Sequence, residues 1–343
     1  MCRVLWGVVV QESADTGPIR RLAITGSSGY LGGRVIEYVR RQSPTTRILG
    51  LDLRQPTSAA PDEFILADIL DEGLGQTVRA FAPDTIVHGA FVFQPMRDTR
   101  RMRRINVEGT QNVLRIAAAV QPRRLLLVSS ATAYGAWPDN PVPMDESRPL
   151  RARPELQYAS DKTEIEQLLA AFAQQHPRIA VSTVRPAIIG GPNMDNYLTR
   201  FIFGMPFIGL LDGRDPPLQL VHEDDVVAAI YEILAHDGRG PYNVGPPDHV
   251  SLSELARRTN RRAWKLPFWL AYTAAWLAWK IRLPIHEWPP GLLYFVREPW
   301  VVAPVRLQRE LGFQFRYGSI ETLHQIVEGI ERRSRSSRGE ARP

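Results

Sequence analysis

A tyrosine and a lysine four residues apart are the side chains of this sequence whose types and spacing most clearly suggest catalysis. Tyr158 and Lys162 lie near the start of a segment predicted to be helical, residues 155–175, and this separation puts both side chains on one face. The lysine is informative because the chain has only three lysines among 42 basic residues. A nearby ammonium favours the phenolate of a tyrosine, whose ordinary pKa is about 10. Tyr158 would then exchange a proton with a substrate oxygen.

A serine at the end of a predicted strand completes this set. Ser130 directly follows the apolar run 125–129, and ligands of open α/β sheets bind beyond the carboxyl ends of the strands. Its hydroxyl would hydrogen-bond the same substrate oxygen. We therefore expect Ser130, Tyr158 and Lys162 to be the catalytic residues. The alternative is an exposed helical pair with an unrelated serine.

A glycine-rich turn near the beginning of the chain predicts a site for the phosphates of a dinucleotide. The glycines follow the apolar run 22–25 and precede a helical pattern. The first permits a tight turn, the second lets the backbone approach a pyrophosphate, and the third lets helix and strand pack closely. The N–H groups at the start of the helix would face the phosphates. The residues expected to contact the cofactor here are Gly26, Ser28, Gly29, Tyr30, Leu31 and Gly32.

An aspartate twenty residues after the last of these glycines bears on the choice of cofactor. Asp52 ends the second predicted strand, where a carboxylate would bind the ribose hydroxyls of NAD. Arg54 leaves NADP as an alternative, because a guanidinium could meet a 2′-phosphate. A turn aspartate without a ligand is the other alternative.

The elements that must position these residues alternate short apolar strands with amphipathic helices. The strand-like runs are residues 22–25, 48–51, 85–88, 125–129 and 179–184. The helical patterns between them include residues 30–41, 97–120 and 155–175. Runs rich in Ile, Leu and Val suit strands that are buried on both faces of a parallel sheet. The predicted fold class is therefore α/β, a Rossmann-type doubly wound parallel sheet.

The composition changes after Pro186, where prolines and glycines become frequent. Shorter helices are predicted over 224–235, 251–259 and 320–332, with a returning strand over 242–244. We expect four regions. The first two are a flexible leader (1–20) and an NAD(P)-binding Rossmann domain (21–185, joined by some later segments). The other two are residues 186–331, which form mainly a smaller C-terminal α/β substrate-binding cap, and a disordered basic tail (332–343).

Composition and spacing exclude several classes of protein. A single cysteine, Cys2, excludes an internal disulfide framework, and no histidine pair has a ligand spacing, so we expect no metal site. Five arginines in residues 332–343 supply most of the net charge of +6, so nucleic-acid binding is not expected. The chain has no run of 18 apolar residues, and residues 1–10 lack a cleavage site, so we expect a cytoplasmic protein.

The order of these motifs resembles that of the extended short-chain dehydrogenase/reductase family, of the NAD-dependent epimerase/dehydratase type, over roughly residues 21–330. Other similar stretches are residues 67–68, 88–90, 106–110, 129–135, 185–186, 222–225, 242–245 and 309–313. The resemblance implies that Asp68 contacts the adenine of NAD and that Ser130, Tyr158 and Lys162 are catalytic. It also implies cofactor contacts at Ile69, Gly89, Ala90, Asn106 and Pro186.

Departures from the family pattern bear on the reaction. Dehydratase relatives carry an acidic pair where this chain has Ala131 and Thr132, which disfavours the elimination of water. Sugar-nucleotide epimerases usually have an asparagine at the position of Ile188 and a diphosphate-binding arginine at that of Leu218, although Arg214 could substitute. The sequence of residues 185–189 is more similar to that of the branch that includes 3β-hydroxysteroid dehydrogenases and aldehyde or ketone reductases. The residues expected to contact substrate are Phe91, Thr132, Ile188 and Arg214.

Two further segments suggest partners. Residues 266–279 carry no charge, contain three tryptophans and are flanked by basic residues, which predicts a pocket wall or a buried cap helix, or else peripheral membrane contact. Either interpretation favours an apolar or amphiphilic substrate. Five arginines between 97 and 104 open a helix that, by resemblance, helps to form a homodimer. They are either a solvated rim or a site for an anionic group.

The leading hypothesis is an NAD(P)-dependent oxidoreductase that transfers hydride at a secondary alcohol or ketone, with Tyr158 as the acid/base. The alternative is a nucleotide-sugar 4-epimerase that uses tightly bound NAD. A third hypothesis, a dinucleotide-sensing scaffold without catalysis, needs only the glycine loop and Asp52, so it leaves the Tyr158–Lys162 pair unexplained.

Overall fold

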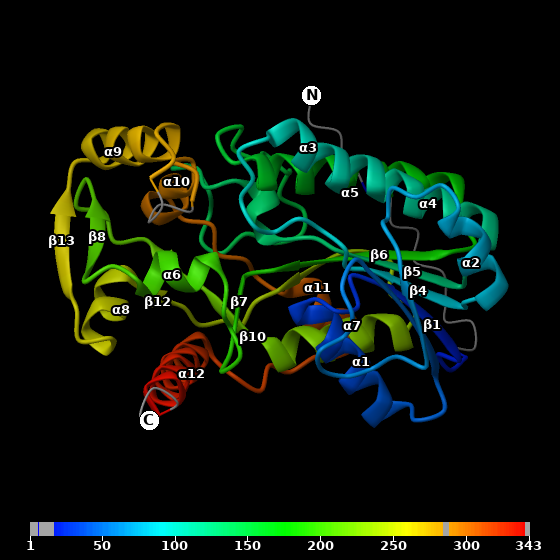
Figure 1. The fold of residues 1–343 in the computed structure, drawn as a ribbon. Coiled ribbons are helices and arrows are strands. Elements are labelled where there is room, and N and C mark those ends of the chain that lie inside the picture. The colour runs from blue at the N-terminus through cyan, green and yellow to red at the C-terminus, as the bar shows by residue number, and fades with distance from the viewer. Residues whose placement is uncertain (1–5, 7–16, 284–287, 340–343) are drawn as a thin grey trace.

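A seven-stranded, wholly parallel sheet occupies one half of the molecule (Figure 1). The computed structural model describes residue 6 and residues 17–283 and 288–339. Across the sheet the strands lie in the order β11-β6-β5-β4-β1-β2-β3. They are β1 (Arg21–Thr25), β2 (Arg47–Asp52), β3 (Glu63–Leu66), β4 (Thr85–His88), β5 (Arg124–Val128), β6 (Ala180–Pro186) and β11 (Gly240–Val244). The predicted doubly wound α/β fold is confirmed.

Helices cover both faces of the sheet, because strands without a polar face must be buried on each side. One face carries α1 (Tyr30–Gln42), α7 (Glu223–Ala235) and α11 (Val305–Leu311). The other carries α2 (Leu74–Phe81), α4 (Gly109–Val120) and α5 (Gln157–Gln175). The chain winds outward from β1 through β2 to β3 and then crosses to β4 on the other side of β1. This reversal opens a crevice beyond the carboxyl ends of β1 and β4.

The cap forms the other half of the molecule and is built from short strand pairs and helices (Figure 1). The pairs join β7 (Ile188–Gly190) to β10 (Leu220–His222), β9 (Pro217–Leu218) to β12 (Val250–Ser251), and β8 (Phe207–Leu211) to β13 (Arg262–Leu266). The helices are α6 (Tyr197–Phe203), α8 (Leu252–Arg258), α9 (Phe268–Lys280), α10 (Leu292–Arg297) and α12 (Ser319–Gly339). An apolar core of the cap continues to Leu156 and Tyr158 at the start of α5, so that the two halves share one wall.

The ends of the described chain differ from the expected leader and tail. The helix α12 continues to Gly339 and so includes residues 332–339 of the tail that was expected to be disordered, whereas 340–343 lie outside the described residues. Arg333 ties this helix to the cap by donating to the carbonyl oxygens of Pro192 and Met194, which a periodicity argument could not foresee. Within the expected leader, Trp6 packs against the core and Ile19 is buried, whereas 1–5 and 7–16 lie outside the described residues.

Two predicted helices differ from expectation, one in its continuity and the other in its burial. The single helix expected over 97–120 begins at Thr99 and is interrupted by a π-helical turn, Arg104–Glu108, between α3 (Thr99–Arg103) and α4. The apolar segment at 266–279 forms α9, but Ala275 is the one buried residue of that helix, so the buried-helix interpretation is wrong. No helix in the described part of the chain has the length and apolarity to cross a membrane.

A buried ion pair joins the helix α5 to the parallel sheet. Glu166 of α5 and Arg185 of β6 are 0% and 2% exposed, and two guanidinium nitrogens bind the carboxylate at 2.6–3.0 Å. Ser129 Oγ donates to the same carboxylate at 2.5 Å. The third guanidinium nitrogen, Nη1, donates to the Tyr134 hydroxyl at 2.6 Å, and this hydroxyl donates to Asn243 of β11 at 2.8 Å. Every charge is thus satisfied by a named partner, which burial of an ion pair requires.

Removing one partner of this pair should destabilise the protein strongly. Glu166→Gln leaves the guanidinium of Arg185 buried without a carboxylate, so we expect the free energy of unfolding to fall by about 3–5 kcal/mol. The double variant Glu166→Gln/Arg185→Met carries no buried charge and should recover part of this loss. Urea unfolding measures both. The control Glu63→Gln, whose pair with Arg47 is 44% and 57% exposed, should change by less than about 1 kcal/mol; equal losses would contradict the argument.

Candidate functional site

A cavity of about 1220 Å³ runs from the glycine-rich loop after β1 to the apolar core of the cap. Its sheet end is lined by the loops that follow β1, β4 and β5, together with the first turns of α5. Of the expected cofactor contacts, those lining the cavity are Gly26, Ser28, Gly29, Tyr30, Leu31, Gly32, Gly89, Tyr158, Lys162 and Pro186. This is the crevice that the strand order opens.

The glycine-rich loop has the geometry that its spacing predicts. Gly26 has a φ of 74°, and a Cβ there would lie 2.6 Å from the backbone nitrogen of Ala90. A Cβ on Gly32 would lie 2.1 Å from the carbonyl oxygen of Gly26. Only glycine fits at these two positions, since each clash is with backbone that cannot move aside. The loop consequently lies flat against β4, and the start of α1 at Gly29 faces the cavity with unpaired N–H groups.

Asp52 supports this loop directly. It ends β2, and its carboxylate accepts hydrogen bonds from the backbone nitrogens of Ser28 at 3.0 Å and Arg54 at 3.1 Å. The Ser28 hydroxyl donates to the carbonyl oxygen of Arg54 at 2.6 Å. Asp52 does not line the cavity, whereas the exposed Arg54 does. The structure therefore places the acidic and the basic candidate for ribose recognition side by side at one edge of the crevice.

The remaining residues that were expected to contact the cofactor are half-buried or buried. Asp68 accepts from the backbone nitrogen of Leu70 at 2.9 Å, which forms the turn after β3. Ile69 is 7% exposed, and its carbonyl oxygen accepts from the Asn112 amide at 2.8 Å. Asp68, Ile69, Ala90 and Asn106 all lie outside the cavity lining.

A buried polar chain fixes the loop that follows β4. His88 Nδ1 lies 2.7 Å from the Thr25 hydroxyl, and Nε2 lies 3.0 Å from the Thr110 hydroxyl. Thr110 donates its proton to the carbonyl oxygen of Asn106, so Nε2 must be the protonated nitrogen of a neutral ring. Burial, together with the charge of Lys162, lowers the pKa of His88 to about 3, which agrees with this assignment.

Asn106 extends this chain to α5. Its side-chain oxygen accepts from the backbone nitrogen of Val92 at 2.7 Å, and its amide nitrogen donates to the buried carboxylate of Asp161 at 2.8 Å. Gln157 donates to the other carboxylate oxygen at 2.7 Å. Asn106 therefore holds the cavity-lining loop 91–94 against α5 rather than facing the cavity itself.

Ser130 and Tyr158 both line the cavity and lie within hydrogen-bonding distance of each other. Ser130 begins the 3₁₀ turn Ala131–Tyr134, and its hydroxyl accepts from the backbone and side chain of Thr132 at 3.2 and 3.0 Å. Burial raises the pKa of Tyr158, and a hydrogen bond with the Ser130 side chain lowers it only in part. With these protein groups alone the phenol is therefore protonated at neutral pH, whereas the expected phenolate depended on the ammonium and also on the charge of a bound nicotinamide.

The position of Lys162 gives the reason for this difference. Its ammonium donates to the carbonyl oxygen of Val128 at 2.7 Å and lies 3.4 Å from the ring centroid of Phe91, but 5.7 Å from the centroid of Tyr158. The lysine thus shares the helical face with Tyr158 as expected, but its charge is directed to Phe91. Burial lowers the pKa of Lys162 to about 7, against the opposing effects of Glu166 and Asp161.

Three of the four residues expected to contact substrate line the cavity, namely Phe91, Thr132 and Ile188. Arg214 does not. Its guanidinium binds the carboxylate of Glu298 at 2.5 Å, and that carboxylate is 2% exposed. Because Glu298 is also paired with Arg297, Arg214 serves a structural ion-pair cluster, and we no longer expect it to bind a diphosphate.

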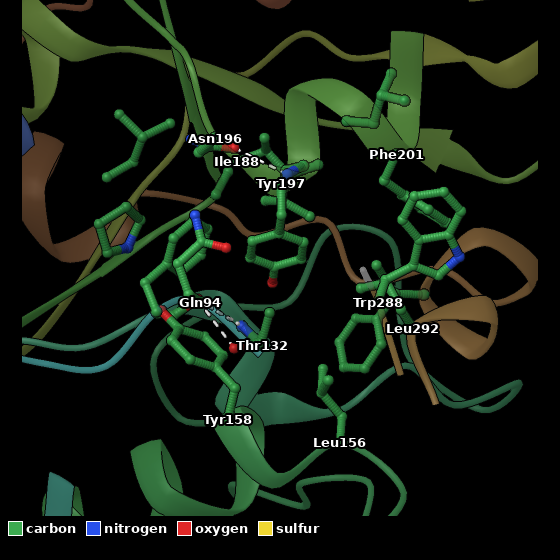
Figure 2. A pocket seen from close by; sticks show the side chains of 18 of the residues that line it. Gln94, Thr132, Leu156, Tyr158, Ile188, Asn196, Tyr197, Phe201, Trp288 and Leu292 are labelled. Atoms are coloured by element: carbon green, nitrogen blue, oxygen red, sulfur yellow. Dashed lines mark hydrogen bonds between the residues drawn. The ribbon is translucent and has the colours of Figure 1, made fainter. Parts of the chain in front are cut away.

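Two aromatic residues that the sequence reasoning missed, Phe93 and Tyr197, lie near Tyr158 together with the expected Phe91. Figure 2 shows Tyr158 of α5 and Tyr197 of α6 projecting into the same space. Phe91 and Phe93 contact the Tyr158 ring edge-on, with centroids 5.4 and 5.6 Å away, and Phe93 lies 4.9 Å from Tyr197. A capping box at Asn196, three residues before Thr199, begins α6 and was the available signal for this helix.

Known proteins are similar to this chain in sequence and in fold. An uncharacterized protein of Mycobacterium tuberculosis is 27% identical over 316 residues, which cover 89% of this chain and 83% of that protein. The UDP-glucose 4-epimerase of Mycolicibacterium smegmatis is 26% identical over 257 residues, covering 68% of this chain and 80% of that enzyme. A UDP-glucose-4-epimerase structure from Stenotrophomonas maltophila, with bound NAD and formylated UDP-arabinopyranose, superimposes with a TM-score of 0.73 at 19% identity, covering 93% and 100% of the two chains.

The family model of the NAD dependent epimerase/dehydratase family matches residues 22–245, from β1 to the end of β11. This span includes the glycine-rich loop, Ser130, Tyr158 and Lys162. The chain belongs to the NAD dependent epimerase/dehydratase family.

Proposed function

We propose that this protein is an NAD-dependent oxidoreductase that transfers hydride at a secondary alcohol or ketone of an apolar substrate. The observation that carries the proposal is the polarity of the cap. Among the described residues from 186 onward that line the cavity, none is cationic, and the one charged side chain is Asp195. A nucleoside diphosphate needs cations or many hydrogen-bond donors to replace its hydration. This lining favours a substrate that is itself largely apolar.

The far side of the cavity is built from aromatic and aliphatic side chains. Phe201, Trp288 and Leu292 lie across from Tyr158 in Figure 2, and Phe201 packs edge-on against Trp288 with centroids 5.3 Å apart. Ile188 and Leu218 both line the cavity. They stand at the positions where sugar-nucleotide epimerases usually have an asparagine and a diphosphate-binding arginine. An apolar molecule placed here would bury its surface against these side chains and bring a carbonyl to Tyr158.

The cofactor is NAD, in keeping with the family and with the residues at the edge of the crevice. The N–H groups at the start of α1 suit the pyrophosphate, and the Asp52 carboxylate next to Ser28 suits two ribose hydroxyls. The same carboxylate would repel the 2′-phosphate of NADP. Arg54 is the residue through which NADP would bind instead.

The chemistry follows from the protonated phenol. NADH, held by the glycine-rich loop, would supply the hydride for the carbonyl carbon. Tyr158 donates its proton to the carbonyl oxygen, which becomes the hydroxyl of the alcohol, and Ser130 holds this oxygen through a hydrogen bond. Lys162, whose ammonium lies one helical turn away, would bind the ribose hydroxyls and stabilise the phenolate that remains. In the reverse direction the phenolate takes the proton back.

The alternative is a nucleotide-sugar 4-epimerase. Its support is the similarity to the Mycolicibacterium smegmatis UDP-glucose 4-epimerase and to solved epimerase structures. An epimerase removes and returns the same hydride, so it would retain NAD through purification and act without added cofactor.

Tyr158→Phe should abolish turnover while leaving the fold and cofactor binding intact. Loss of the proton donor is expected to lower kcat by about 100-fold or more, with the Kd for NAD within a factor of about three. Steady-state rates with a panel of steroidal and long-chain ketones measure the effect. The matched control is Tyr38→Phe, which also removes one hydroxyl. Tyr38 lies on α1, where it packs against Tyr231 of α7. Unchanged turnover in Tyr158→Phe would refute the role of this residue.

The affinity for NAD should fall as pH rises above 7. Burial lowers the pKa of Lys162 to about 7 in the free protein, and hydrogen bonds to ribose would raise it, so NAD binds the protonated form more tightly. Between pH 6 and 9 we expect the Kd to increase by about tenfold or more, as measured by calorimetry. Lys162→Met should bind more weakly at pH 6 and show no such trend. A pH-independent Kd in the parent protein would contradict this linkage.

Thermal unfolding distinguishes the two candidate reactions. A ligand at 100 times its Kd stabilises the folded state by about 2.7 kcal/mol, so binding is visible as a higher Tm. We expect NAD to raise the Tm and an apolar ketone to raise it further, whereas UDP-glucose and UDP-galactose leave it unchanged. A Tm raised by the UDP-sugars, together with their interconversion without added NAD, would establish the epimerase instead. NAD binding without turnover of either substrate class would favour a cofactor-sensing scaffold.

A further inference from the structure

The cap helix α9 presents apolar side chains on both of its sides. The face toward the cavity consists of small residues, namely Ala271, Ala274, Ala275 and Ala278. The opposite face carries large apolar residues at helical spacing, and they are Trp269, Leu270, Trp276 and Leu277, followed by Ile281 just beyond the helix. Trp269 is 68% exposed and Ile281 67%, so the described residues of the chain leave this face largely uncovered. A cluster of this kind on one surface marks an interaction site.

Cations surround this exposed face. Lys265 before the helix and Lys280 and Arg282 at its end are exposed, and no acidic residue occurs between 261 and 283. Lys280 Nζ lies 4.7 Å from the ring centroid of Trp276. Arg97, from the loop before α3, lies 4.1 Å over the ring of Trp279 and donates to its carbonyl oxygen. The apolar face therefore has a basic rim supplied by two separate parts of the chain.

Asp212, the carboxylate that contacts the start of α9, is itself paired and does not offset this charge. Asp212 accepts from the backbone nitrogen of Phe268 at the start of α9, but it is also paired with Arg297 at 2.8 Å. The rim thus keeps a net positive charge. A second copy of this chain would bring the same cations together across a two-fold axis, which like-charge repulsion opposes. An anionic lipid surface would instead attract each of them.

We propose that the exposed face of α9 docks on a lipid bilayer that contains anionic headgroups. Tryptophans with flanking lysine and arginine occupy the interfacial region of a bilayer, where the rings enter the acyl boundary and the cations meet the phosphates. A helix of 13 residues is about 20 Å long, which is too short for a hydrocarbon core of about 30 Å. The helix would consequently lie along the surface.

Docking in this orientation has a consequence for the cavity, which rests on the proposed function. The alanine face of α9 is a cavity wall, so the apolar cavity would be held within one helix diameter of the bilayer. An apolar ketone or alcohol is concentrated in the bilayer and would reach Tyr158 from there. The docking itself depends on no catalytic step.

Vesicle flotation of the full chain, saturated with NAD, tests the docking. We expect the protein to float with phosphatidylcholine vesicles that contain about 30% phosphatidylglycerol and to do so more weakly at high salt. The variant Trp269→Ser/Trp276→Ser/Leu277→Ser should lower the bound fraction at least tenfold. Lys280→Gln/Arg282→Gln should reduce binding to these anionic vesicles and leave any binding to vesicles of phosphatidylcholine alone unchanged. The control Val142→Ser/Val305→Ser removes apolar side chains that are 46% and 42% exposed elsewhere and should bind like the parent protein.

Three results would overturn the proposal. The parent protein could fail to float with the anionic vesicles, or the variant Trp269→Ser/Trp276→Ser/Leu277→Ser could float as well as the parent. The triple variant could also convert a dimer to a monomer in sedimentation, without any vesicle binding by the parent, which would make the face a subunit interface. A Tm increase by NAD in each variant shows that it is folded. Because flotation needs no turnover, failure of the assigned reaction and failure of docking are read separately.

Discussion

The buried pair of Glu166 and Arg185 is the interaction on which the arrangement of the site most depends. It joins α5 to β6, and through Tyr134 it reaches Asn243 of β11, so the strands on either side of the catalytic loop are held in one network. Lys162 lies one helical turn before Glu166 on the same helix and is held by the carbonyl oxygen of Val128. Rotation of α5 would break an ion pair that water cannot reach, which keeps Tyr158 and Lys162 at fixed positions relative to Ser130.

Two features of the cavity act on the same catalytic tyrosine in opposite directions. Burial among Phe91, Phe93 and Tyr197 raises the pKa of Tyr158, while the hydrogen bond with Ser130 lowers it. The low polarity that keeps the phenol protonated is also what suits an apolar substrate. The electrostatics of the catalytic residue and the chemistry of its substrate therefore have one cause, the aromatic and aliphatic composition of the cap wall.

The helix α9 connects this cavity to the surface of the molecule. The alanines of α9 form a thin cavity wall on one side, and its large apolar residues face outward on the other. Neither of these two faces of the helix is polar. A soluble monomer has no need of such a helix at its surface. The apolar substrate and the lipid surface that we propose thus account for the two sides of one element.

The sequence by itself determined the parts of the protein that depend on local spacing. The glycine positions predicted the turn at Gly26 and the close packing at Gly32, and the alternation of apolar runs predicted the parallel sheet, because backbone sterics and burial act on neighbouring residues. The spacing of Tyr158 and Lys162 likewise predicted a shared helical face.

Only the tertiary structure decided which charges meet. It directed the Lys162 ammonium to Phe91, paired Arg214 with Glu298, and turned Asn106 away from the cavity toward Asp161. It also showed that α9 is exposed, which its uncharged sequence had left open between a wall, a core helix and a membrane contact. Such contacts join residues far apart in the chain, and no local periodicity records which distant group will neutralise a charge or cover an apolar face.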